Sequence, residues 1–91
     1  MRLFIDVREP SEFAVDHVPG AINIPPAQIM HGTPGALVDV DTDTQLILYC
    51  RSGARSHASM YYLRQYGFTN LVNGINKDQV MARFSTDIIS S

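Results

Sequence analysis

The feature that most constrains this chain is a continuous apolar run, Gln45–Tyr49, that leads directly into its single cysteine, Cys50. An uninterrupted apolar segment of this length is typical of a strand buried on both faces of a parallel sheet. Small residues follow at 51–54, and the apolar spacing over 55–66 predicts a helix that ends at Gly67. Ligands of parallel α/β sheets bind beyond the carboxyl ends of the strands, so Cys50 lies where a site is expected.

The rest of the chain alternates between short segments of the same two kinds. Strands are expected at 3–5, 21–23 and 69–72, and helices at 9–16, 27–30 and 77–84. Asn73-Gly74 predicts a turn, and 31–44 predicts a loop with one apolar turn at 36–40. Alternating strands and helices favour an α/β fold, a small open parallel sheet flanked by helices.

Length and charge favour one domain and argue against several functions. At 91 residues the chain has room for one hydrophobic core, so a single domain over residues 1–91 is expected. The net charge of −2 argues against nucleic-acid binding, which usually needs a basic surface. No apolar run is long enough for a membrane span, and Asp6 interrupts any secretory signal. A cytoplasmic location is expected, or a periplasmic one if a signal peptide was removed before Met1.

The residues around Cys50 favour a reactive thiol over an inert one. A lone cysteine has no disulfide partner and is often a small buried hydrophobic residue, so the evidence for a reactive thiol must come from its neighbouring residues. The N–H groups of a short loop that opens a helix can converge on an anion, and the helix dipole adds to their effect. Gly53 permits the conformations such a loop needs, while Arg51 and Arg55 add positive charge. Cys50 is therefore expected to ionise more readily than a free thiol.

The spacing between cysteine and arginine separates two kinds of anion chemistry. Phosphatases of the cysteine class use Cys-x5-Arg, whereas this chain has Cys50-x4-Arg55, with Ser56 at the phosphatase arginine position. A tighter loop favours a terminal sulfur over a phosphate. The interpretation is a thiolate that takes up one sulfur atom as a persulfide; a cysteine phosphatase or an arsenate reductase is the alternative.

Other polar residues are interpreted as structural. Asp6 and Arg8 follow the first strand, where they are expected to support the loop, and Asp6 could also hold Arg55. His17 precedes a Pro-Gly turn and is expected to bond local backbone. None of the three histidines has metal-ligand spacing, so no metal site is expected.

Three segments of the chain resemble the signature motifs of the rhodanese family. They are Ile5–Phe13, His17–Pro25 and Tyr49–Ser56, and the resemblance runs from Leu3 to about Gly74. The chain looks most like the short, single-domain members. It departs from many members by starting directly on the strand that carries Asp-Val-Arg. It also lacks the Gly-Gly followed by a tryptophan that many members have near the C-terminus.

The resemblance implies a rhodanese-like fold and thiosulfate sulfurtransferase activity through a persulfide on Cys50. By position, Cys50 is the nucleophile, and the substrate-binding loop consists of Arg51, Ser52, Gly53, Ala54 and Arg55. The implied donor is a small sulfur anion such as thiosulfate, and the acceptor is cyanide or a thiol, including that of a thioredoxin-like protein. No metal or organic cofactor is implied. A persulfide carrier or redox-sensing module acting on a partner protein is the alternative.

Overall fold

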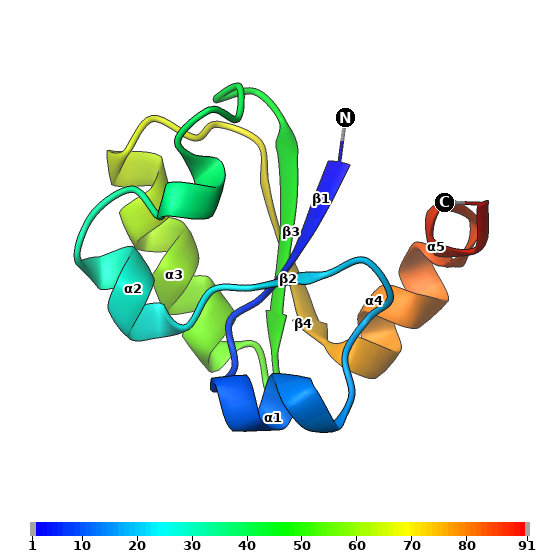
Figure 1. Cartoon of the computed structure of the whole chain (residues 1–91). Helices are drawn as coiled ribbons and strands as arrows, with labels where there is room; N and C mark the ends of the chain where they lie inside the picture. The colour runs from blue at the N-terminus through cyan, green and yellow to red at the C-terminus, as the bar shows by residue number, and fades with distance from the viewer. Residues whose placement is uncertain (1, 91) are drawn as a thin grey trace.

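The computed structural model describes the backbone of residues 2–90 and the side-chain surroundings of residues 2–88. Its centre is a four-stranded sheet with the strand order β2-β1-β3-β4, in which all pairings are parallel (Figure 1). The strands are β1 (Arg2–Asp6), β2 (Ile22–Asn23), β3 (Gln45–Cys50) and β4 (Leu71–Asn76). The expected α/β fold with an open parallel sheet is confirmed.

The helices cover both faces of the sheet and one of its ends. They are α1 (Pro10–Val15), α2 (Pro26–Met30), α3 (Ala54–Gln65), α4 (Lys77–Arg83) and α5 (Ser85–Ser90), with a 3-10 turn at Gly35–Leu37. Figure 1 shows α2 and α3 on one face, α4 and α5 on the other, and α1 below the carboxyl ends of the strands. Among the described residues, no helix combines the length and apolar character that crossing a membrane requires.

The central strand β3 divides the hydrophobic core into two parts. Successive side chains of a strand point to opposite faces, so Leu46, Leu48 and Cys50 join the α2–α3 side of the core. Ile47 and Tyr49 join the other side, with Val80 of α4. All five of these β3 side chains are buried, as the continuous apolar run predicts for a strand covered on both faces.

The last strand differs from its prediction. The expected turn at Asn73-Gly74 is wrong, because both residues lie inside β4. Leu48 pairs with Asn73 and Tyr49 with Ile75, so Gly74 is the extra residue of a β-bulge. A Cβ at Gly74 would lie 2.5 Å from a methyl carbon of Val80, which accounts for glycine at this point. Ile75 follows with a positive φ of 75°, a strained conformation for a β-branched residue.

Candidate functional site: the cysteine loop

Cys50 ends β3, and its side chain is almost fully buried, with 2% exposed. The chain then turns through Arg51 and Ser52 to Gly53, which has a φ of 90° in the left-handed region and precedes the first residue of α3. In this conformation the Gly53 N–H donates to the Cys50 Sγ at 3.1 Å. The Ser56 hydroxyl, one turn into α3, lies 3.6 Å from the same sulfur. The loop therefore directs hydrogen-bond donors at the thiol.

These donors change the acidity of the thiol. Burial alone raises the pKa of Cys50, but hydrogen bonds from the Ser56 hydroxyl and from the backbone N–H groups of Ser56, Ser52 and Gly53 outweigh it. The net effect lowers the pKa of Cys50 below that of an ordinary thiol, to about 7. A larger fraction of the protein therefore carries a thiolate at neutral pH than an ordinary cysteine would, and the thiolate is the form that reacts as a nucleophile.

The two arginines of the loop face a carboxylate that the sequence interpretation did not single out. The Arg55 Nη1 donates to the Glu12 Oε1 at 3.0 Å, and the Arg51 Nη1 lies 3.9 Å from the other oxygen of Glu12. This contact lowers the pKa of Glu12 through the hydrogen bond from Arg55. Arg51 is 77% exposed and Arg55 34%, so both keep access to solvent. The available signal was the position of Glu12 in the first turn of α1, at the end of the sheet that also holds Cys50.

Asp6 and Arg8 bind each other, so the suggestion that Asp6 holds Arg55 is wrong. The Arg8 Nη2 donates to the buried Asp6 carboxylate at 2.7 Å, and the Arg8 N–H donates to it at 2.9 Å. The same Nη2 also donates to the carbonyl of Asp16, just beyond α1, at 2.6 Å. The pair therefore fixes the end of β1 to α1, and α1 in turn presents Glu12 to the loop.

A second set of contacts reaches the loop from β4. The Asn73 Nδ2 donates to the Gly53 carbonyl at 3.1 Å, and the Asn73 Oδ1 accepts from the Ile75 N–H at 2.9 Å and from the Ser56 hydroxyl at 2.7 Å. A Cβ on Gly53 would lie 3.4 Å from the Ile75 Cγ2, so the Ile75 side chain packs directly behind the loop. The sequence interpretation missed Asn73 because its place in a bulge depends on packing distant in sequence.

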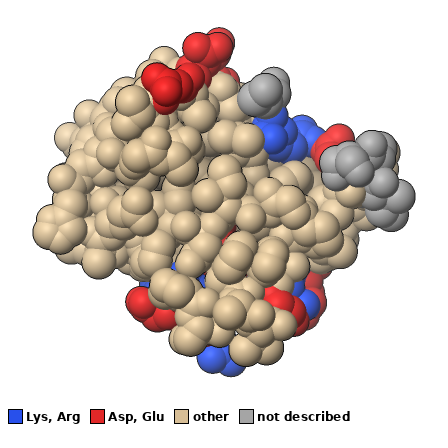
Figure 2. All heavy atoms as spheres, viewed as in Figure 1, with Lys and Arg blue, Asp and Glu red and all other residues tan. Residues whose placement is uncertain are grey.

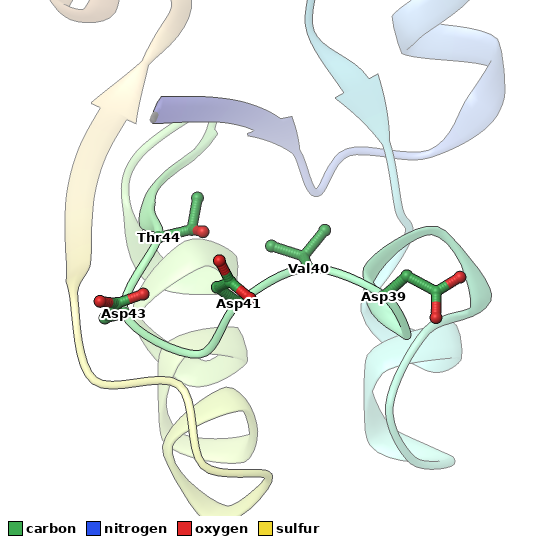
Figure 3. Close-up of a pocket in the computed structure, with 5 residues that line it drawn as sticks. All are labelled: Asp39, Val40, Asp41, Asp43 and Thr44. Atoms are coloured by element: carbon green, nitrogen blue, oxygen red, sulfur yellow. The ribbon is translucent and has the colours of Figure 1, made fainter.

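Two pockets lie at opposite ends of the sheet. The one beside the cysteine loop has a volume of about 240 Å³ and is lined by Arg8, Glu12, Val15, Asp16 and Arg51. The one at the amino end has a volume of about 360 Å³ and is lined by Asp39, Val40, Asp41, Asp43 and Thr44 (Figure 3). Figure 2 shows a group of acidic side chains at the upper left of this view, and basic and acidic side chains together at the lower, carboxyl end. The two pockets therefore differ in charge: three carboxylates line the amino-end pocket, whereas two arginines and two carboxylates line the pocket beside the cysteine loop.

The histidine near the site has a local role. The His17 Nδ1 lies 2.7 Å from the Phe13 carbonyl, and its ring stacks on the Phe13 ring with centroids 3.7 Å apart. The prediction that His17 bonds local backbone is confirmed. In the part of the chain that the structure describes, no group of three or more potential ligands is arranged to hold a metal ion.

The fold and loop together define an α/β protein with an ionisable cysteine at the carboxyl end of a central parallel strand. The Rhodanese-like domain family matches residues 1–77, most of the chain, and the chain belongs to this family. The resemblance noted in the three sequence segments is thereby confirmed. Family membership does not by itself assign a role to each loop residue of this chain, so those roles remain predictions.

Individual relatives agree with this membership. The chain is 37% identical over 71 residues to a sulfurtransferase of Allochromatium vinosum, covering 78% of this chain and 63% of that protein. It is 33% identical over 81 residues to the thiosulfate sulfurtransferase PspE of Escherichia coli, covering 88% and 76%. A solved structure, a rhodanese with anions from E. coli, superposes with a TM-score of 0.75 at 29% identity, covering 87% and 91%. The chain thus spans less than two thirds of the Allochromatium protein and most of PspE.

Proposed function

We propose that this chain is a sulfurtransferase that takes the outer sulfur of thiosulfate onto Cys50 and passes it to a thiophilic acceptor. The observation that carries the proposal is the Cys50 Sγ at the strand end, 3.1 Å from the Gly53 N–H, with its pKa lowered to about 7. Relatives described as a sulfurtransferase and as a thiosulfate sulfurtransferase support this chemistry.

The first half-reaction is a displacement at sulfur. The Cys50 thiolate attacks the outer sulfur of thiosulfate, and a new S–S bond forms as the original S–S bond breaks. Sulfite leaves with the bonding electron pair, and Cys50 becomes a persulfide with a negatively charged outer sulfur. Arg51 and Arg55 attract the dianion, and the N–H groups at the start of α3 stabilise the negative sulfur before and after transfer.

The second half-reaction returns the thiolate. A cyanide carbon or a thiolate acceptor attacks the outer sulfur, forming thiocyanate or a new persulfide, and the electron pair of the S–S bond returns to Cys50. Because sulfur is stored on the protein between the two steps, the kinetics should be ping-pong.

The proposal is tested by mass spectrometry of the intact protein after thiosulfate treatment. We expect an adduct of one sulfur atom on the wild type, lost on addition of cyanide with release of thiocyanate. Cys50→Ala should show neither adduct nor turnover. A wild type without the adduct, or a Cys50→Ala variant that still turns over, would overturn the assignment.

Hydrolysis of a phosphate ester is the alternative that the loop supports least. The position where a phosphatase arginine would stand is Ser56, which is fully buried and bonds to neighbouring backbone and side-chain oxygens. Hydrolysis of p-nitrophenyl phosphate should therefore be absent. Cys50-dependent hydrolysis of this ester would favour the phosphatase over the sulfurtransferase.

A persulfide carrier that serves one partner protein is favoured by one observation at the rim of the site. Val15 is 84% exposed and lines the same pocket as Arg51, which gives the rim an apolar contact beside an exposed guanidinium group. Transfer of labelled sulfur to a thioredoxin-like protein distinguishes the two functions. A carrier would transfer sulfur to it much faster than to cyanide or to a small thiol, whereas an enzyme of low acceptor specificity would serve all three.

A further inference from the structure

The Ser56 hydroxyl has more potential partners than it can serve at once. It carries one hydrogen, and three acceptors surround it: the Asn73 Oδ1 at 2.7 Å, the Gly53 carbonyl at 3.0 Å and the Cys50 Sγ at 3.6 Å. Ser56 is fully buried, so bulk water does not compete for this hydrogen. The hydroxyl must therefore donate to one acceptor in each state of the site.

The orientation of the Asn73 amide is fixed from two sides. Its Oδ1 accepts from the Ile75 N–H at 2.9 Å, and its Nδ2 donates to the Gly53 carbonyl at 3.1 Å. If the amide were flipped, its Nδ2 would face the Ile75 N–H and its Oδ1 would face the Gly53 carbonyl, and neither contact would be a hydrogen bond. The Ser56 hydroxyl therefore meets the oxygen of the Asn73 amide. With a neutral thiol, the hydroxyl donates to this oxygen, its shortest contact, and can accept from the Cys50 S–H.

Ionisation of Cys50 changes which acceptor is strongest. A thiolate attracts a donor more strongly than a neutral carbonyl does, because charge-assisted hydrogen bonds are the stronger ones. If the hydroxyl turns to the sulfur, the Asn73 Oδ1 keeps its bond from Ile75 and the Gly53 carbonyl keeps its bond from the Asn73 Nδ2. No buried acceptor then loses its last partner, which would otherwise oppose the rotation.

Building on the proposed function, we propose that Asn73 is a positioning residue, which holds the Ser56 hydroxyl beside Cys50 and lets it turn to the sulfur when that sulfur becomes an anion. Ser56 touches the reacting atom, and Asn73 acts through Ser56, while the Gly53 carbonyl and the Ile75 N–H only orient the Asn73 amide. The same hydroxyl would serve the thiolate before sulfur uptake and after release. The strained bulge thus has a role, because it brings the amide of Asn73 behind the loop.

The charged groups near the loop and Asn73 are left intact by the variants below. They are Arg51 and Arg55 of the loop and α3, Glu12 of α1, the Asp6–Arg8 pair at the end of β1, Lys77 at the start of α4, which pairs with Asp16, and Arg83 of α4, which donates to the Asn73 carbonyl. Arg55 and Arg51 are the cations that stabilise a negative sulfur, and Glu12 opposes them. A change in thiol acidity in the Ser56→Ala or Asn73→Ala variant, which neither adds nor removes a charge, is therefore assigned to hydrogen bonding.

The test is the rate of alkylation of Cys50 by iodoacetamide as a function of pH, which requires no thiosulfate. Ser56→Ala should lower the rate at pH 7 by roughly tenfold and leave the alkaline plateau unchanged, because it removes a donor to the thiolate. Asn73→Ala should lower the rate at pH 7 several-fold, and the double variant should equal Ser56→Ala alone. Ser56→Thr keeps a hydroxyl and should restore the wild-type profile. The matched control is Asn70→Ala, just before β4 at the amino end of the sheet, with no expected change.

Two results would overturn the proposal. One is an Asn73→Ala profile identical to the wild type, and the other is a full additional shift by Asn73→Ala in the Ser56→Ala background.

Should Asn73→Ala fail to fold by circular dichroism, Asn73→Asp replaces it, since its shape is nearly the same. A carboxylate would hold the hydroxyl and repel the thiolate, so the profile should move to higher pH, and no movement would overturn the proposal. Persulfide formation is measured separately. If the alkylation profiles are as expected but no persulfide forms, the sulfurtransferase proposal is wrong and the role of Asn73 stands.

Discussion

The two ends of the parallel sheet contain pockets that differ in size and in charge: one is lined by carboxylates alone among charged groups, and the other by arginines and carboxylates together. The amino-end pocket, at about 360 Å³, is the larger and is lined by three carboxylates in segment 39–44 (Figure 3). The carboxyl-end pocket, at about 240 Å³, adjoins the loop that holds the thiol. In a parallel sheet each strand leads into a helix N-terminus at the carboxyl end, so unpaired N–H groups gather there. Backbone direction, rather than cavity size, locates the candidate site.

The use of backbone N–H groups at the two ends makes the same point. At the amino end they join one loop to the next: the Thr69 N–H donates to the Thr42 carbonyl at 2.9 Å, and the Leu46 N–H to the Asn70 carbonyl at 2.9 Å. At the carboxyl end, the Gly53 N–H donates to a side-chain sulfur. A backbone N–H group that does not join two segments of the backbone, such as that of Gly53, is available to stabilise negative charge on the Cys50 sulfur.

The sharpest test of the comparison pairs two glycines that flank α3. Gly53→Ala should lower the rate of sulfur transfer at pH 7 by roughly a hundredfold, because alanine disfavours the φ of 90° that directs the N–H at the sulfur. Gly67→Ala alters a φ of 101° at the far end of the helix and should cost similar stability, about 1–2 kcal/mol, with turnover retained. Thiocyanate production and urea unfolding measure both effects. Equal losses of turnover in the two variants would contradict a special role for the carboxyl end.

A second prediction uses the acidity of the thiol. The folded protein has a Cys50 pKa of about 7, below the unfolded value of about 8.5, so between these values the folded state binds fewer protons. This contribution to stability is fully present above the unfolded value and is lost as the pH falls through the folded value. The free energy of unfolding of the wild type relative to Cys50→Ser should therefore grow by about 2 kcal/mol from pH 6 to pH 10. Urea unfolding under reducing conditions measures it, and a difference independent of pH would remove the electrostatic basis of the site.

A third prediction compares two arginines on one helix. Arg55→Gln in the first turn of α3 should raise the KM for thiosulfate by roughly tenfold, since it removes a charge beside the bound anion. Arg64→Gln in the last turn, nearer the acidic loop, should change the KM by less than about twofold. Steady-state kinetics at low salt measures both. A larger effect at Arg64 than at Arg55 would reverse the comparison.

The smallest effect is expected at the acidic pocket itself. Asp43→Asn removes one exposed carboxylate and should change kcat/KM for thiosulfate by less than about twofold, because solvent and salt screen a charge at the far end of the sheet. The same assay across a salt series measures it. A several-fold change that persists at high salt would show that the amino-end pocket takes part in the reaction.

What the sequence predicts well is local in the chain. The run 45–49 and the apolar spacing over 55–66 correspond to β3 and α3 within a residue or two, because hydrophobic periodicity and a glycine cap act over short distances. The same locality explains the placement of Cys50 at a strand end. The fold class follows from the alternation of such segments.

What the sequence did not predict depends on contacts distant in the chain. The turn expected at Asn73-Gly74 is a bulge, since the space left by Val80 and the pairing with β3 determine its conformation. Glu12 was not singled out because its partner, Arg55, lies 43 residues away. Helix α5 was also missed, as the segment after Phe84 carries too weak an apolar pattern of its own.

The parallel pairing of β3 has a consequence for when the thiol becomes reactive. Parallel neighbours are never joined by a hairpin, so β3 must pair with β1 across the first half of the chain and with β4 across α3. Until those pairings form, Cys50 lacks the donors from α3 and the backing from Asn73, and it behaves as an ordinary cysteine. The lowered pKa of the thiol thus depends on long-range contacts, and the rate of Cys50 alkylation at pH 7 during refolding should change as those contacts form.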